Sequence, residues 1–156
     1  MISPVISNDE DVARVLFYPS FFTEDDNPLI SEGILSPTAF RLQVLKSGDA
    51  EKAISVLRTM VDSFSHDVAK LSPRQPTDFK YGYALLNVGD VRTINIPTTR
   101  KIDISVEYSN SKRLLSHSEI LLRLDGNIVT AMDESMEVAR FRKKLARIAS
   151  TRIIRL

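Results

Sequence analysis

The sequence predicts an α+β fold, in which an antiparallel sheet of four or five strands packs against a long central helix and a basic C-terminal helix. Apolar residues recur every three or four positions in residues 50–71 and again near the C-terminus, which is typical of helices. In residues 101–108 they alternate with polar residues, which is typical of a strand. The length of 156 residues and the 43% hydrophobic content fit one domain that spans residues 1–156.

The N-terminal segment is predicted to form a short helix followed by an irregular connection. Ser7 and Glu10 have the spacing of a capping box, and apolar residues follow at helical spacing until Pro19, which cannot continue a helix. Residues 23–37 are rich in Asp, Asn, Pro, Ser and Gly, which is typical of a loop. We expect a single helical turn in residues 37–40.

The strongest periodic pattern lies in residues 50–71 and predicts the long central helix. Steps of three and four alternate along its apolar positions, which are Ile54, Leu57, Val61, Phe64, Val68 and Leu71. Ser63 and Ser65 mark a point where this helix could break in two, and Pro73 ends it. The same spacing fits a coiled-coil seam, but a core helix is the commoner outcome.

The strands of the predicted sheet follow this helix. In residues 101–108 every second side chain is apolar, so one face of the strand is expected to be buried. Two short connections, at residues 88–90 and 125–127, contain Gly and Asp and fit hairpins. The other predicted strands are residues 80–88, 91–96, 119–124 and 128–132.

The last helix is predicted to begin near Asp133 and to end around Ser150. One side of its helical projection is apolar and carries Val138, Phe141, Leu145, Ile148 and Ala149. The opposite side is basic and carries Arg140, Lys143, Lys144 and Arg147. This pattern lets the helix pack inward while it presents positive charge to solvent.

Charge is distributed unevenly along the chain. Residues 1–75 hold 7 basic and 11 acidic residues, whereas residues 76–156 hold 14 basic and 9 acidic residues. Half of those later basic residues fall between Arg140 and Arg155, so the last helix is predicted to be a docking surface. An acidic protein surface is the expected partner, and nucleic-acid phosphates are the alternative.

The composition excludes several classes of site. The chain has no Cys, which removes thiolate nucleophiles, disulfides and cysteine-ligated metals. Its five Gly residues do not cluster into a phosphate-binding loop, and no carboxylate spacing indicates a metal, so we expect no cofactor. No apolar run approaches the roughly 20 residues of a membrane span, and no signal-peptide pattern is present. The expectation is a cytoplasmic protein without a membrane partner.

Residues 116–119, with the sequence Ser-His-Ser-Glu, are the candidate for chemistry. On a strand, His117 and Glu119 would point to the same face, and Glu119 would orient the imidazole for general acid/base catalysis. The alternatives are a capping box formed by Ser116 and Glu119, or a polar histidine at a sheet edge. We expect that the two side chains do not line a cavity together.

Short motifs spread over most of the chain resemble a loosely defined group of small uncharacterised bacterial proteins. The motifs are Ala39-Phe40, Ser55-Val56-Leu57-Arg58, Gly82-Tyr83-Ala84, Val91-Arg92 and His117-Ser118-Glu119-Ile120. The resemblance carries no established activity, and it implies a bacterial setting and a reason to test His117 and Glu119.

The sequence therefore favours a non-catalytic partner-binding or accessory subunit of a larger bacterial assembly, which docks through its basic C-terminal helix. A small hydrolase or transferase that uses His117 with Glu119 is the first alternative. Non-specific nucleic-acid binding through the same helix is the second.

Overall fold

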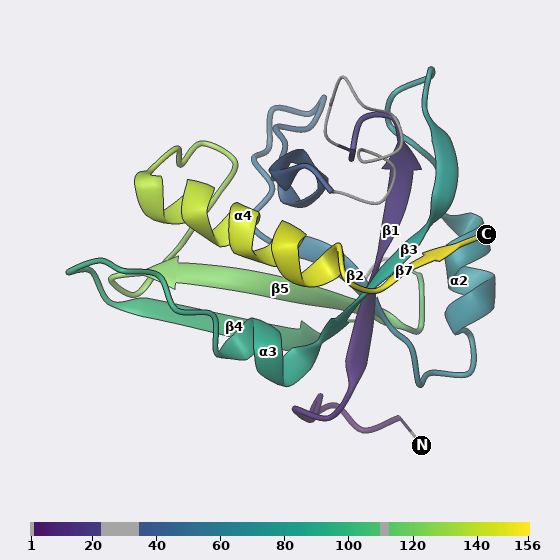
Figure 1. The fold of residues 1–156 in the computed structure, drawn as a ribbon, viewed down its shortest axis with the longest axis horizontal. Helices are drawn as coiled ribbons and strands as arrows, with labels where there is room; N and C mark the ends of the chain where they lie inside the picture. The colour runs from purple at the N-terminus through teal and green to yellow at the C-terminus, as the bar shows by residue number, and fades with distance from the viewer. Residues whose placement is uncertain (1, 23–34, 110–112) are drawn as a thin grey trace.

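The computed structural model describes residues 2–22, 35–109 and 113–156 and has an α+β fold (Figure 1). The strands run antiparallel in a seven-stranded sheet of order β4-β5-β2-β1-β3-β7, and β6 pairs with β5. The strands are β1 (Asp11–Tyr18), β2 (Ile54–Arg58), β3 (Phe79–Asn87), β4 (Ile102–Tyr108), β5 (His117–Leu124), β6 (Asn127–Ile128) and β7 (Ile153–Arg155). The helices are the 3-10 turn η1 (Pro37–Phe40), α2 (Phe64–Lys70), α3 (Val88–Arg92) and α4 (Met136–Ala149).

The sheet separates between β1 and β2. These two strands pair only at Val12↔Arg58 and Ala13↔Leu57, after which β1 continues to pair with β3 as far as Tyr18. In the opposite direction β2 continues to pair with β5. Figure 1 shows β1 crossing the direction of β5 steeply, so the sheet consists of two halves joined at a short seam.

Apolar side chains pack on both faces of this sheet. The larger core joins β1, β2 and β3 to η1 and α4, and it includes Val12, Leu16, Val56, Phe40, Phe141 and Leu145. The smaller core lies on the opposite face and includes Val15, Leu57, Val68 and Leu114, with Phe64 packed against it from α2. Consecutive residues such as Val56 and Leu57 enter different cores because successive strand side chains point to opposite faces.

The predicted N-terminal helix is wrong, because residues 11–18 form the strand β1. The capping-box contact does form, since the backbone N–H of Ser7 donates to Glu10 Oε2 at 2.9 Å, but it closes a turn that leads into a strand. Val12, Ala13, Val15 and Leu16 are all buried. Burial on both faces of a strand removes the alternating pattern, so the apolar spacing resembled that of a helix.

The predicted long central helix is also wrong, because residues 50–71 contain the strand β2 and the short helix α2. Ile54 packs in the larger core and Leu57 in the smaller one, so they do not share a helical face. No helix breaks in two at Ser63, because a strand precedes it, and Ser63 is the N-cap at which α2 begins. The regular spacing arose from a strand, an irregular connection and a helix in succession.

The strand predictions after residue 78 are partly confirmed. The segments predicted as strands at residues 80–88, 101–108 and 119–124 correspond to β3, β4 and β5. Residues 91–96 are not a strand: α3 covers the first two of them and begins at the N-cap Asn87, whose side chain accepts from the Asp90 N–H at 2.9 Å. The last predicted strand is only the two-residue β6. The sheet in the described part of the chain has seven strands, not the predicted four or five, and the strands that the prediction lacked are β1, β2 and β7.

The C-terminal helix α4 lies close to its predicted position. Ser135 is its N-cap, and Val138, Phe141, Leu145 and Ala149 are buried. The segment after it, predicted as an apolar tail, forms β7 and pairs with β3. None of the helices in the described ranges is long and apolar enough to cross a membrane.

Candidate functional site

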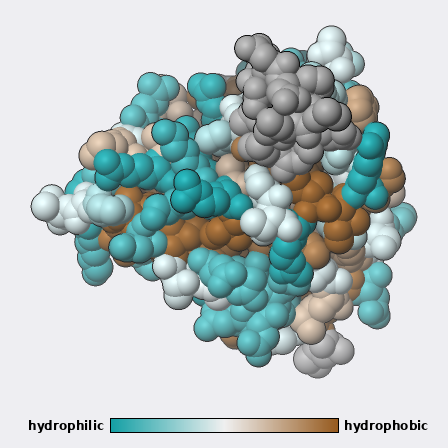
Figure 2. Space-filling model, viewed as in Figure 1, coloured by the Kyte–Doolittle hydropathy of each residue, from teal (hydrophilic) through white to brown (hydrophobic). Residues whose placement is uncertain are grey.

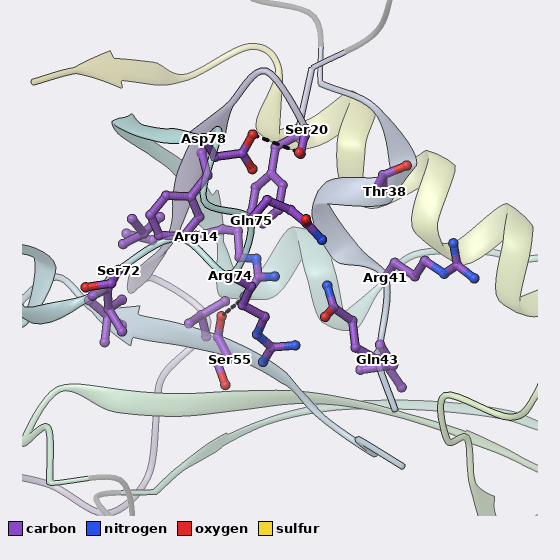
Figure 3. Close-up of a pocket in the computed structure, with 18 of the residues that line it drawn as sticks. Arg14, Ser20, Thr38, Arg41, Gln43, Ser55, Ser72, Arg74, Gln75 and Asp78 are labelled. Carbon is purple, nitrogen blue, oxygen red and sulfur yellow. Dashed lines mark hydrogen bonds between the residues drawn. The ribbon is translucent and has the colours of Figure 1, made fainter. Parts of the chain in front are cut away.

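A cavity of about 850 Å³ lies where β1 and β2 separate. Residues 13–15 and 17 of β1 form one wall, residues 55–57 of β2 form the other, and residues 71–78 contribute to the rim. Figure 3 shows its polar side chains, which come from segments far apart in the sequence. The polar lining residues are Arg14, Ser20, Thr38, Arg41, Gln43, Ser55, Ser72, Arg74, Gln75, Thr77, Asp78 and His117.

Arg14 bridges the separated strands. If the register Ala13↔Leu57 continued, Val15 would face Ser55, but the pairing stops at Ala13. The Ser55 carbonyl instead accepts from Arg14 Nη1 at 2.9 Å, and Arg14 Nε donates to the Ala39 carbonyl at 2.9 Å. Two of the three guanidinium nitrogens are therefore fixed by backbone oxygens.

The third nitrogen of Arg14, Nη2, makes no hydrogen bond or ion pair with any residue in the described part of the chain. Burial lowers the pKa of the Arg14 guanidinium to about 10, an effect that Glu51 opposes and Arg74 reinforces. The group is still positively charged at neutral pH. Arg14 thus presents a fixed, partly desolvated cation with an unused donor to the cavity.

Two further arginines line the cavity and differ in their environment. Arg74 forms a two-point ion pair with Glu51, with Nη1–Oε1 at 3.1 Å and Nη2–Oε2 at 2.8 Å. These hydrogen bonds raise the pKa of Arg74 above its usual value. Arg41 is exposed and extends from the rim towards α4 (Figure 3). Asp78 is also on the rim, where its carboxylate accepts from Ser20 Oγ at 2.9 Å.

His117 lies in the cavity wall, and Glu119 is not among the lining residues. Residues 117–119 do lie in a strand, β5, so the strand interpretation is correct. His117 and Glu119 are two positions apart in it and share one face, and they pair with Leu57 and Ser55 of β2. His117 is 2% exposed, with Nδ1 2.7 Å from the Ser109 carbonyl and Nε2 3.2 Å from Ser55 Oγ. Both ring nitrogens therefore face partners other than the Glu119 carboxylate.

The basic face of α4 is partly occupied by intramolecular contacts. Arg140 Nη1 donates to the Pro97 carbonyl at 3.1 Å, whereas Lys143, Lys144 and Arg147 make no hydrogen bond or ion pair within the described residues. Hydrophilic side chains cover the region of α4 in the space-filling view (Figure 2). This face is separate from the cavity, whose lining includes no residue of α4.

Within the described residues, no group of three or more His, Cys, Asp or Glu side chains is placed to hold a metal ion. The polar groups that line the cavity are guanidinium, hydroxyl, amide and imidazole groups and the Asp78 carboxylate on the rim.

Sequence reasoning missed Arg14, Arg74 and Ser55 as site residues. The available signal was Arg14 itself, which is the one charged residue in the apolar run from Val12 to Phe17. An isolated charge in a strand with a core on each face needs a specific partner, and it marks a candidate site. Nothing in the sequence near Ser55 indicates that it meets His117, because 62 residues separate them.

No family model matches this chain, and comparison with curated proteins and with solved structures also gives no match. The resemblance to small bacterial proteins therefore stays a prediction, and function must be argued from the geometry.

Proposed function

We propose that this protein binds a small ligand in the cavity between β1 and β2 and recognises an anionic group of that ligand through Arg14. The observation that carries the proposal is the arrangement of the guanidinium of Arg14, a lining residue of the cavity: two backbone carbonyls hold Nε and Nη1, and Nη2 has no hydrogen-bond partner in the described residues.

The energetics support an anionic ligand. A carboxylate or phosphate that bonded to Nη2 would form a charge-assisted hydrogen bond in a partly dehydrated site, where such bonds are stronger than in water. Because Arg14 is already fixed, little side-chain entropy would be lost on binding. The volume of about 850 Å³ falls within the range of small-molecule sites, about 300–1,000 Å³.

The test is titration with inorganic phosphate and with benzoate, followed by NMR chemical shifts of backbone amides. We expect saturable shifts at residues of β1 and β2 that line the cavity. The variant Arg14→Lys keeps the charge but loses the fixed fork of donors, so its affinity should fall by roughly tenfold or more. The matched control is Arg147→Lys on α4, which should bind as wild type. Shifts confined to α4, or equal affinities for wild type and Arg14→Lys, would contradict the proposal.

A second candidate function is docking of α4 onto an acidic protein surface, as an accessory subunit of a larger bacterial assembly. The observation that favours it is the absence of partners for Lys143, Lys144 and Arg147 in the described part of the chain. Replacing Arg140, Lys143, Lys144 and Arg147 by Glu should abolish copurification of the native partner without unfolding the protein.

Duplex DNA is the competing partner for this face. Four phosphate contacts would give a log–log salt slope of about −3.6 and only weak binding. Submicromolar affinity for duplex DNA near physiological salt would therefore favour nucleic acid over an acidic protein.

A further inference from the structure

Ser55, His117 and the Ser109 carbonyl form a hydrogen-bonded chain in the cavity wall. A carbonyl oxygen can only accept, so the 2.7 Å contact between His117 Nδ1 and the Ser109 oxygen places the ring proton on Nδ1. In the neutral ring, Nε2 is then the unprotonated nitrogen. It lies 3.2 Å from Ser55 Oγ, where it can accept a hydrogen bond from the hydroxyl.

This arrangement has the three parts of an activated nucleophile. Ser55 supplies the hydroxyl, His117 supplies a base at hydrogen-bond distance, and a third group fixes the orientation of the base. The third group is a backbone carbonyl, not the Glu119 carboxylate expected from the sequence.

The backbone holds the imidazole rigidly. The Ser109 N–H donates to the His117 carbonyl at 3.0 Å, while the His117 ring donates to the Ser109 carbonyl, so the two residues are joined at two points. Asp67 fixes the preceding residue, because its carboxylate accepts from Ser116 N at 3.0 Å and from Ser116 Oγ at 2.6 Å. A base held in this way is preorganised for proton transfer.

Arg14 contacts Ser55 through the backbone, since its Nη1 donates to the Ser55 carbonyl at 2.9 Å. This contact helps to fix the strand that carries the hydroxyl, and Arg14 lines the same cavity. Ser55 and His117 both line the cavity, so a substrate bound there would meet the nucleophile.

We propose that Ser55 is the nucleophile of an acyl-transfer site that hydrolyses a carboxylic ester bearing an anionic group. Ser55 Oγ bonds to the ester carbonyl carbon while its proton passes to His117 Nε2. The bond from this carbon to the alcohol oxygen then breaks, and the alcohol leaves with the proton from Nε2. Water attacks the acyl-serine, His117 takes one proton from it and returns that proton to Ser55 Oγ, and the acid is released. The net reaction consumes ester and water and yields acid and alcohol.

This inference rests on the proposed function for the place where substrate binds, but its test is independent of anion binding. Wild type is treated with diisopropyl fluorophosphate, which reacts with activated serines, and the adduct is located by mass spectrometry of peptides. We expect one adduct per chain, on Ser55. Ser55→Ala should lose it, and His117→Gln should slow its formation by about 10²-fold or more. The control Ser65→Ala changes an exposed serine of α2 outside the cavity and should leave labelling unchanged.

Thermal unfolding of each variant ensures that the loss of labelling is not the loss of the fold. Because His117 is buried, Ser55→Cys provides a second measurement: its thiol should react with iodoacetamide faster than the thiol of Ser65→Cys. No adduct on Ser55, an adduct that forms equally fast in a folded His117→Gln variant, or equal reactivity of the two thiols would overturn the proposal. If phosphate still binds through Arg14 in that case, the ligand-binding function stands and only the acyl-transfer step fails.

Discussion

At the scale of single residues, this fold depends on a few charged side chains held among apolar ones. Arg58 is 2% exposed and forms a two-point ion pair with Glu10, with Nε–Oε1 at 2.9 Å and Nη2–Oε2 at 3.0 Å. Its guanidinium also lies over the Tyr108 ring, 4.9 Å from the centroid. A buried guanidinium is tolerated only with such partners, so we interpret Arg58 as a structural residue. Arg14 differs, because its Nη2 has no hydrogen-bond partner in the described residues.

Asp67 is the buried acid whose titration should be visible in stability. Burial raises the pKa of its carboxyl, but the hydrogen bonds from Ser116 and Ser63 outweigh this effect, so the pKa lies below its usual value. A depressed folded-state pKa stabilises the protein fully above the unfolded-state pKa of about 3.9, and the contribution is lost as pH falls through the folded-state value.

The first prediction follows from the lowered pKa of Asp67. Asp67→Asn should lower the free energy of unfolding at pH 7, and the difference from wild type should shrink as the pH falls from 5 to 3, because Asp67 then protonates in the unfolded chain before it protonates in the folded protein. Urea unfolding at pH 7, 5 and 3 measures it. The control is Asp62→Asn, an exposed residue whose effect should be small at every pH. A difference between Asp67→Asn and wild type that does not change with pH would contradict this account.

At the scale of elements, β4 was the clearest strand in the sequence because it buries only one face. In β4, Ile104 and Val106 are buried while Asp103 and Glu107 are exposed, so the alternation is direct evidence of a strand. The hairpin at Asp125 and Gly126 was also predictable, because Asp-Gly is a common hairpin sequence. Both residues adopt the positive φ that such a turn needs, 52° and 84°. Strands β1 and β2 were not, because a core on each face erases alternation and leaves spacing that also fits a helix.

The second prediction concerns the segment that replaces the expected long helix. Val61 lies between β2 and α2 and is 5% exposed, whereas His66 lies on the exposed side of α2. Val61→Asp would bury a carboxylate without a designed partner and should cost about 3 kcal/mol or more. His66→Ala should stay within about 0.5 kcal/mol of wild type. Chemical denaturation compares the two, and similar stabilities would mean that this segment does not pack as described.

At the scale of the whole molecule, the candidate site exists because the sheet is divided. The two halves meet only at the seam between β1 and β2, and the cavity occupies the space where pairing stops. No periodic pattern in the sequence encodes this separation, since it depends on how far two strands 36 or more residues apart remain paired. This is why α4 and its charges could be predicted, whereas the cavity, Ser55 and the role of Arg14 could not.

The last prediction is that Arg14 holds the two halves together. Its guanidinium donates to the carbonyl of Ala39, which belongs to η1 in the larger core, and to the carbonyl of Ser55 in β2. Arg14→Met would therefore leave two backbone acceptors without this donor. Each lost partner costs about 1–3 kcal/mol, and water that enters the cavity can replace part of the loss. We therefore expect Arg14→Met to lower the free energy of unfolding by about 2–4 kcal/mol.

The control Arg147→Met makes the same chemical change on an exposed surface and should stay within about 0.5 kcal/mol of wild type. Urea denaturation measures both, and amide hydrogen exchange should quicken first along β2 in the Arg14 variant, where one bridge to the other half is gone. If Arg14→Met and Arg147→Met were equally stable, Arg14 would not act as the bridge across the divided sheet.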